Sequence, residues 1–240
     1  MLDQSCKGGP SGAGCGPDQG GRFCGHGSAR GIPRAVELLL ALGGLVVSSP
    51  FLFLGAALIR ATSSGPVLFR QKRMGRVGKP FELIKLRSMR VESKGAQVTA
   101  KGDARVTPVG RLLRKTKLDE LPELWNVARG ELSLVGPRPE VPKYVDPEDP
   151  LWQKVLEARP GITDPVTLRL RNEEELLGRQ KDPEGFYTAV LQPYKLRGYV
   201  EYLDGRTPWS DLRVLWHTLL AVLTPSRTPP PSIDELRPKP

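Results

Sequence analysis

Residues 34–60, RAVELLLALGGLVVSSPFLFLGAALIR, form the most strongly patterned stretch of this 240-residue chain. Glu37 is the only charged residue between the two bracketing arginines, and an apolar run of this length is sufficient to cross a bilayer as one helix. The stretch is too long for the apolar region of a cleaved signal peptide. Its length and apolarity also disfavour a buried helix of a soluble protein. We therefore predict that this segment attaches the protein to a membrane.

A proline in the middle of the stretch predicts a sharp kink. Pro50 lacks a backbone donor and disfavours the helical conformation at Ser49, so we expect two halves, residues 34–48 and 51–60, each too short to span a bilayer alone. Basic residues flank both ends, and the positive-inside tendency would place both flanks in the cytoplasm. A hairpin that returns to the same face satisfies both observations. A single span remains an alternative, because proline is tolerated in membrane helices.

The remaining sequence is basic, and its charge is uneven. The formal net charge is +10, and residues 60–118 contain 16 lysines and arginines but only three acids. Such a block suits a phosphorylated substrate, acidic lipid headgroups or nucleic acid, and equally an ordinary solvated face. We predict no nucleic-acid partner, because no recognisable motif is present and the block contains few aromatic residues.

The two ends of the chain have a composition typical of disorder. Residues 1–32 are rich in glycine and residues 225–240 in proline, so we expect neither segment to fold. All three cysteines, Cys6, Cys15 and Cys24, lie in the first segment, where no closely spaced cysteine pair indicates a zinc site. No disulfide framework is therefore expected in the folded part.

Residues 61–224 are predicted to form one cytoplasmic α/β domain, mostly helical with a small sheet. Residues 66–71 and 81–86 have the pattern of two short strands around a turn at 75–80. Helices are predicted over residues 109–115, 121–129, 151–158, 173–180, 193–202 and 209–223. The last of these is amphipathic, and both interfacial membrane contact and core packing explain its apolar face.

Residues 116–126, TKLDELPELWN, carry the clearest chemical pattern. Pro122 suits the first turn of a helix, which places Asp119 and Glu120 at or just before its N-terminus, where the helix dipole and free N–H groups favour negative charge. An ionised aspartate can attack phosphorus, and an adjacent carboxylate can hold a divalent cation. Acids at helix starts are also common caps, so the pattern alone admits both interpretations.

Cations accompany the two carboxylates. In residues 136–139, GPRP, prolines flank Arg138 on both sides, and a rigid backbone would aim a guanidinium that makes paired hydrogen bonds to phosphate. Lys85, Arg87, Arg111 and Arg114 precede the Asp–Glu pair. Each could also be an ordinary surface charge.

Six motifs in this order resemble the bacterial sugar transferases, the monotopic polyprenyl phosphate phosphoglycosyltransferases, in their small form. They are Ser49-Pro50, FRQKRMG at 69–75, FELIKLRSM at 81–89, LDELPELWN at 118–126, SLVGPRP at 133–139 and RPGIT at 159–163. The resemblance covers roughly residues 33–223. It implies a re-entrant membrane hairpin at residues 33–60 that involves Arg34, Ser49 and Pro50, with the catalytic domain on the cytoplasmic face of the inner membrane.

The resemblance also implies a reaction and its residues. A sugar-1-phosphate passes from a UDP-sugar to polyprenyl (undecaprenyl) phosphate through a covalent intermediate on Asp119, releases UMP, and starts an exopolysaccharide, O-antigen, capsule or glycoprotein glycan. Glu120 is associated with Mg²⁺ (or Mn²⁺). Arg138 and Arg114, and less closely Lys85, Arg87 and Arg159, match basic positions near substrate phosphates. Anionic membrane lipids are further expected partners, and a homodimer is one option for the assembly.

Residues 164–173, DPVTLRLRNE, depart from the common family pattern of a Gly-Trp followed by a Gln-Val-Asn-Gly-Arg-like stretch. This loop is expected to contact the sugar or the nucleotide, so no particular sugar is predicted. The alternative function is a membrane-tethered scaffold of a polysaccharide assembly complex that keeps the fold without turnover. The presence of both Asp119 and Glu120 argues against that alternative.

Overall fold

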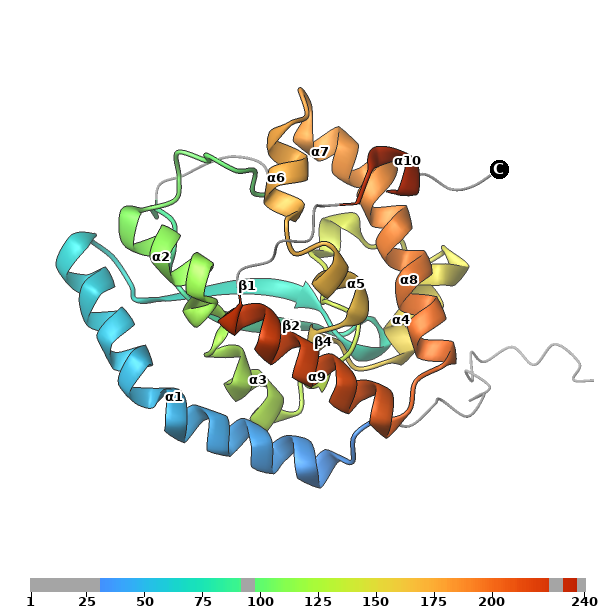
Figure 1. Ribbon diagram of the computed structural model, residues 1–240, viewed down its shortest axis with the longest axis horizontal. Coiled ribbons are helices and arrows are strands. Elements are labelled where there is room, and N and C mark those ends of the chain that lie inside the picture. Colours follow the sequence, from blue (N-terminus) through green and yellow to red (C-terminus); the bar gives the residue numbers. More distant parts are fainter. Residues whose placement is uncertain (1–30, 92–97, 225–230, 237–240) are drawn as a thin grey trace, which may run out of the picture.

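Helices dominate the computed structural model, which describes residues 31–91, 98–224 and 231–236 (Figure 1). The helices are α1 (Arg34–Thr62), α2 (Pro108–Thr116), α3 (Glu123–Arg129), α4 (Pro150–Glu157), α5 (Pro165–Arg169), α6 (Glu173–Gly178), α7 (Pro183–Phe186), α8 (Gln192–Asp204), α9 (Pro208–Leu223) and α10 (Ile233–Leu236). The strands are β1 (Leu68–Met74), β2 (Pro80–Leu86), β3 (Ser133–Val135) and β4 (Gly161–Thr163). The predicted class, mostly α with a small sheet, is confirmed. The glycine-rich segment up to residue 30, with its cysteines, lies outside the described residues.

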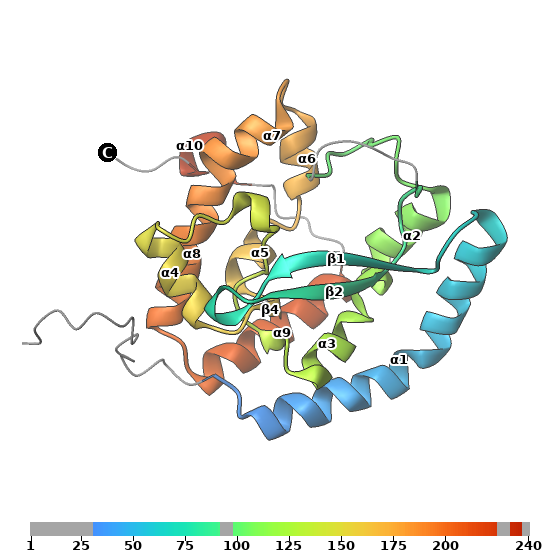
Figure 2. The same cartoon turned by 180° about the vertical axis from the view of Figure 1, so that it is seen from behind.

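Helix α1 differs from the predicted pair of helical halves. It continues from Arg34 to Thr62 with Pro50 inside, and Figures 1 and 2 show it curving along the edge of the molecule. Because Pro50 has no N–H, the carbonyl of Val46 lacks its helical donor, and the Ser49 hydroxyl donates to that carbonyl at 2.7 Å instead. Serine hydroxyls are one of the devices that keep proline-containing membrane helices intact. The expected break at Ser49–Pro50 is therefore replaced by a continuous, curved helix.

One face of α1 packs on the domain along its whole length. The buried positions are Glu37, Ala41, Ser48, Gly55 and Ile59, a spacing of four and seven residues that keeps them on one side of a helix. A side chain at Gly55 would meet Leu86 of β2 at 3.0 Å, so the absence of one lets the helix approach the strand closely. The opposite face of α1 is apolar and exposed.

Both ends of α1 are tied to the same domain by buried polar contacts. At its start, the Ile32 amide donates to Asp211 of α9 at 3.1 Å, and the Leu134 amide of β3 donates to Glu37 at 3.2 Å. At its end, Arg87 donates to the Ser64 carbonyl at 2.6 Å and to the carbonyl and hydroxyl oxygens of Ser63 at 3.0 and 2.7 Å. Ile32 therefore belongs to the folded part, although the sequence pattern placed it in the disordered lead.

Strands β1 and β2 form the predicted hairpin, seen from its exposed side in Figure 2. They pair antiparallel from Leu68 opposite Leu86 to Met74 opposite Pro80. The free edge of β2 is closed by the side-chain amide of Asn126, which donates to the Glu82 carbonyl at 2.7 Å and accepts from the Ile84 amide at 3.1 Å. The Asn126 side chain thus makes the two hydrogen bonds that a neighbouring strand would make, and these bonds hold α3 against the sheet.

A second sheet, which the sequence pattern does not reveal, brings two proline-rich loops together. Strands β3 and β4 pair in parallel, with Val135 opposite Thr163. Just beyond β3 the backbones of Gly136 and Gly161 approach so closely that a side chain on Gly161 would collide with the main chain of Gly136. This contact holds the loop that carries Arg138 beside the one that carries Arg159.

The chain ends with a short helix where disorder was predicted. Residues 231–236 contact the domain. Leu236 is fully buried in a hydrophobic cluster that also contains Leu170, Leu177 and Leu196. Glu235 pairs with Arg169 of α5 at 3.0 Å. The predicted disorder of the whole tail therefore does not describe residues 231–236, which contact the domain through the buried Leu236 and the Glu235–Arg169 pair.

We expect Leu236→Ala to lower the free energy of unfolding by about 3 kcal/mol, because it removes a fully buried side chain. Leu112→Ala, at an exposed position on α2, is the matched control and should change stability little. Chemical denaturation of the detergent-solubilised protein measures both. Equal stability of the two variants would mean that the C-terminal helix does not dock in solution.

Candidate active site

The two predicted carboxylates lie on a tight turn between two helices. Helix α2 ends at Thr116, Lys117 takes the left-handed conformation with φ of 58°, and residues Leu118–Glu120 form one 3-10 turn before α3 begins at Glu123. Asp119 and Glu120 therefore precede the helix, as predicted, and Pro122 stands immediately before it rather than within its first turn. The turn directs both side chains toward the interior.

Asp119 is buried and incompletely partnered. Its Oδ1 atom has no hydrogen-bond partner within the described part of the chain. Burial raises the pKa of Asp119, and the neighbouring charge of Glu120 raises it further, while Lys85, Lys117 and Arg114 act in the opposite direction. A desolvated carboxylate oxygen without a donor is available to a reacting group.

Glu120 has the opposite environment. Its Oε1 atom accepts hydrogen bonds from Lys85 at 3.1 Å and from Arg138 at 2.5 Å, and Lys117 lies 3.9 Å away. Burial alone would raise the pKa of Glu120, but the charges of Arg138, Lys85 and Lys117 hold it well below its usual range. Glu120 is therefore a fixed anion, with its second oxygen, Oε2, free of hydrogen bonds to the described residues.

Glu123 is a third carboxylate of the site, which the sequence analysis missed. It is 1% exposed, and its Oε1 atom lies 3.0 Å from the Lys85 ammonium. Burial raises its pKa, and the charge of Glu120 adds to the effect, while Lys85 opposes it. Its position three residues after Glu120, on the same side of a helical turn, was the signal that could have identified it.

The loop that carries Arg138 is braced from two sides. The guanidinium donates to the Ile162 carbonyl at 3.2 Å as well as to Glu120, and Glu120 raises the pKa of Arg138 well above its usual value. Arg73 at the end of β1 donates to the Pro139 carbonyl at 3.1 Å, and the Met74 amide donates to the Glu140 carbonyl at 2.8 Å. Arg73 was not among the predicted site residues.

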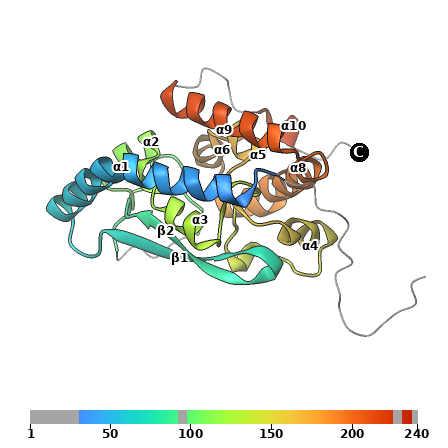
Figure 3. The same ribbon diagram turned by 90° about the horizontal axis from the view of Figure 1, so that it is seen from below.

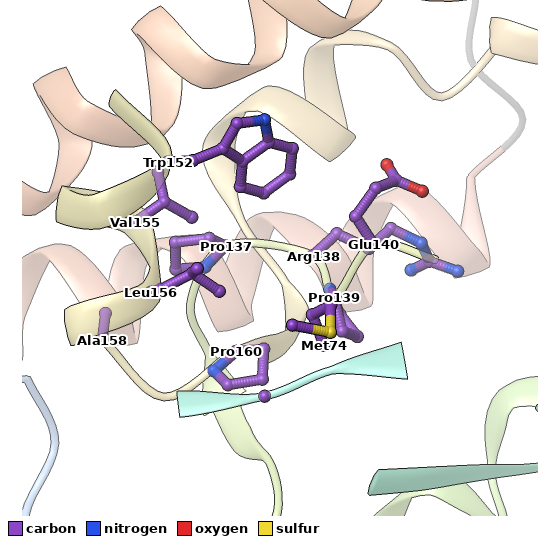
Figure 4. A pocket seen from close by; sticks show the side chains of 11 residues that line it. Met74, Pro137, Arg138, Pro139, Glu140, Trp152, Val155, Leu156, Ala158 and Pro160 are labelled. Carbon is purple, nitrogen blue, oxygen red and sulfur yellow. The ribbon is translucent and has the colours of Figure 1, made fainter. Parts of the chain in front are cut away.

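The other side of this loop is apolar. Figure 4 shows Pro137 and Pro160 beside Trp152, Val155 and Leu156 of α4, with the side chains of Arg138 and Glu140 leading away from them. The hollow among these residues has a volume of about 10 Å³, which is room for about one water molecule. This hollow therefore supports the loop and is too small for a sugar or a nucleotide.

The remaining predicted cations lie at different distances from the carboxylates. Arg114 donates to Ser88 at 3.0 Å and pairs with Glu174 at 2.8 Å, close enough to Asp119 to lower its pKa. The hydrogen bonds of Arg87 go to the end of α1, as described above. Arg159 lies beside the start of α1, 4.0 Å from Glu37. The structure thus brings Lys85, Arg114 and Arg138 close to the dyad, whereas Arg87 and Arg159 make their contacts at the two ends of α1. Their expected role at substrate phosphates stays a prediction.

Carboxylates and cations lie close together at the centre of the site. Three carboxylates, Asp119, Glu120 and Glu123, face three cations, Lys85, Lys117 and Arg138. Most of the cationic contacts converge on Glu120, so Asp119 stays without a direct ion pair among the described residues. Such an arrangement can receive a phosphorylated ligand by exchanging internal ion pairs for pairs with the ligand's oxygens.

Comparison with known proteins identifies the class. The bacterial sugar transferase family matches residues 28–225, so the chain belongs to this family of sugar-phosphate transferases. This confirms the resemblance drawn from the motifs. The matched region ends before α10.

Three relatives show the range of the family. The chain is 36% identical over 197 residues to the UDP-glucose:undecaprenyl-phosphate glucose-1-phosphate transferase of Caulobacter vibrioides, covering 80% of this chain and 69% of that protein. It is 42% identical over 198 residues to the UDP-N-acetylgalactosamine-undecaprenyl-phosphate N-acetylgalactosaminephosphotransferase of Aeromonas hydrophila, covering 80% of this chain and 44% of the relative. It is 33% identical over 192 residues to the uncharacterized sugar transferase EpsL of Bacillus subtilis, covering 80% of this chain and 87% of EpsL. The chain therefore spans less than half of the second relative and most of the third.

We expect Asp119→Asn to raise the free energy of unfolding at neutral pH by about 1 kcal/mol in metal-free buffer, because it removes a buried charge that lacks a full set of partners. Asp103→Asn is the control of opposite sign, since hydrogen bonds from Arg105 hold the pKa of Asp103 below its usual value. Thermal unfolding of both variants tests this. A loss of stability in Asp119→Asn would show that the carboxylate has a stabilising partner.

Proposed function

We propose that this protein transfers a sugar-1-phosphate from a UDP-sugar to a polyprenyl phosphate, with Asp119 as the nucleophile. The observation that carries the proposal is the unpartnered, buried Oδ1 atom of Asp119 beside the ion cluster on Glu120. The names of two relatives, which specify UDP-sugars and undecaprenyl phosphate, support the substrate class. The product would start a membrane-linked glycan such as an exopolysaccharide, O-antigen, capsule or glycoprotein glycan.

The reaction follows from two displacements at one phosphorus atom. In the first, Oδ1 of Asp119 bonds to the β-phosphorus of the donor, and the bond to the bridging oxygen breaks, so that UMP leaves with the electron pair. In the second, a phosphate oxygen of the carrier lipid bonds to the same phosphorus, and the bond to Asp119 breaks. Both attacking oxygens, one of a carboxylate and one of a phosphate, react in their ionised forms and have no proton to lose. The mechanism therefore requires positioning and charge neutralisation rather than a general base.

Arg138 and Lys85 supply the neutralisation. Both already bind an anionic oxygen, that of Glu120, and both retain further donors for phosphate oxygens. Arg138 has a braced backbone on both flanks, so its guanidinium is held in place before the substrate arrives. Fixed donors of this kind stabilise charge that develops during phosphoryl transfer without reorganisation.

Mg²⁺ (or Mn²⁺) is the proposed cofactor, with Glu120 as its protein ligand. Among residues 31–91, 98–224 and 231–236 there is no cluster of three or more metal-binding side chains, but Mg²⁺ commonly uses one or two carboxylates together with substrate phosphates. The unoccupied hydrogen-bonding capacity of Glu120 Oε2 fits that mode. When bound, such an ion would neutralise charge on the diphosphate and on the departing UMP.

Membrane attachment through α1 is the proposed location, with the domain on the cytoplasmic face. Within the described residues α1 is the one helix long and apolar enough to cross a membrane by length and composition, and outward-facing residues such as Val47 and Phe53 are 74% and 77% exposed. Because α1 contacts one domain at both of its ends and along one face, an arrangement with both ends on the same side of the membrane explains the contacts better than a straight span. This supports a monotopic arrangement, as a re-entrant segment requires.

Helix α9 supplies a second apolar surface. It runs in the same direction as α1 in Figure 3, and its exposed side chains include Trp209, Trp216 and Leu223, while Val214 and Asp211 face the core. Tryptophan is favoured at the boundary between lipid and water. We propose that α9 lies in this interface. Lysine and arginine side chains close to the membrane surface would then be attracted to anionic lipid headgroups.

Release of UMP tests the function directly. We expect release from at least one member of a panel of UDP-sugars when undecaprenyl phosphate and Mg²⁺ are present, and loss of release in Asp119→Asn. Mass spectrometry of the quenched protein should find a phospho-sugar on Asp119 and none in the variant. Asp103→Asn is the active control. No release from any donor would favour the scaffold alternative, and an adduct that persists in Asp119→Asn would assign the nucleophile to another residue.

Topology is tested at Pro50. We expect Pro50→Leu to restore the N–H that bonds the Val46 carbonyl, so that α1 straightens and carries an N-terminal tag to the far side of the membrane. Protease protection of the tag in spheroplasts measures this, with Leu54→Ala on the same helix as the control. A tag that remains cytoplasmic in Pro50→Leu would show that Pro50 does not set the topology.

A further inference from the structure

Glu123 is a buried carboxylate for which the proposed reaction has no role. Its Oε1 atom forms an ion pair with the Lys85 ammonium at 3.0 Å, but the pair does not have the geometry of a well-aligned hydrogen bond. Buried polar atoms in folded proteins nearly always have a hydrogen-bond partner, and a buried carboxylate is costly without one. The position of Glu123 therefore needs an explanation beyond packing.

Lys85 stands between two carboxylates and is aligned with only one of them. Its ammonium donates to Glu120 Oε1 at 3.1 Å, and Glu123 Oε1 is equally close. The side chain is flexible and its ammonium has three rotatable donors. A small rotation is therefore enough to transfer the hydrogen bond from Glu120 to Glu123.

Three cations share one oxygen of Glu120. Arg138 and Lys117 approach the same Oε1 atom as Lys85. A divalent cation bound at Oε2 of Glu120 would lie close to the three cations on Oε1, so its binding is favoured if one of these side chains moves away. Arg138 is also fixed by the Ile162 carbonyl, whereas Lys85 has a second carboxylate beside it.

We propose that Glu123 is a positioning residue that receives Lys85 when Glu120 binds a divalent cation. The inference rests on the proposed function, and it concerns the exchange of an internal ion pair rather than a contact between Glu123 and substrate. Glu123 keeps the ammonium inside the site during this exchange, so that its charge remains available to phosphate oxygens. A glutamine of the same shape would accept the hydrogen bond but would not hold the charge.

The test is Glu123→Gln, with metal binding measured independently of turnover. We expect the affinity for Mn²⁺, followed by electron paramagnetic resonance of the free ion, to fall about tenfold. The Mg²⁺ concentration that gives half-maximal UMP release should rise by the same factor, while kcat at saturating metal changes little. Glu123→Asp, which keeps the charge on a shorter side chain, should recover part of the affinity. Glu82→Gln, an exposed carboxylate on β2 that pairs with Arg70, is the matched control.

Two outcomes separate the inference from the function on which it rests. Unchanged Mn²⁺ affinity in both Glu123 variants, with only their thermal stability reduced, would overturn the inference and leave Glu123 a structural residue. Absence of UMP release from the wild-type protein would instead remove the proposed function. The Mn²⁺ titration decides the role of Glu123 in either case, because it requires no turnover.

Discussion

The attachment of α1 to the domain at both of its ends is the constraint on which the rest of the structure depends. An apolar helix of 29 residues would be about 44 Å long if straight, and polar contacts must supplement its packed face to fix its two ends on the domain. Two buried side chains do so. Glu37, inside the helix, accepts from the backbone of β3, and Arg87, at the end of β2, donates to the backbone at the end of the helix. These two contacts fix how the apolar helix lies on the domain.

The same two strands connect the membrane helix to the chemistry. Strand β2 carries Lys85 two residues before Arg87, and β3 leads within three residues from Val135 to Arg138. Arg87, which bonds to the end of α1, and Lys85, which bonds to Glu120, are therefore only two residues apart. The parallel pairing of β3 with β4 and the close contact of Gly136 with Gly161 place the arginine loop against the Asp–Glu turn. If α1 lies in a membrane as proposed, this coupling would hold the site at a constant distance from the membrane surface.

Sequence patterns predicted the elements whose signals are local. The hairpin of β1 and β2, the helices α2, α4, α8 and α9, and the stop of α3 at Gly130 all follow from periodicity and turn residues, and the ordered motifs identified the family. The parallel pair β3–β4 was missed because three-residue strands between prolines have no periodicity to read. The places of Arg87 and Arg159 depend on which strand end meets which helix end, and burial of Glu123 depends on α3 packing against β2. These positions are set by tertiary contacts, which cannot be predicted from a run of basic residues in the sequence.

The two adjacent carboxylates have different environments, which suit them to the different roles proposed for them. Neighbouring acids whose surroundings push their pKa values in opposite directions are suited to different tasks. Here three cations hold Glu120 as an anion, while burial without a paired donor raises the pKa of Asp119. Had the cations converged on Asp119, its oxygen would be hydrogen-bonded and a poor nucleophile. Because the cations bind Glu120, the Oδ1 atom of Asp119 has no hydrogen bond to the described residues. The cations therefore lie beside the position that a phosphate bonded to Asp119 would occupy. The site thus separates the oxygen that is proposed to react, Oδ1 of Asp119, from the oxygen that binds the cations, Oε1 of Glu120.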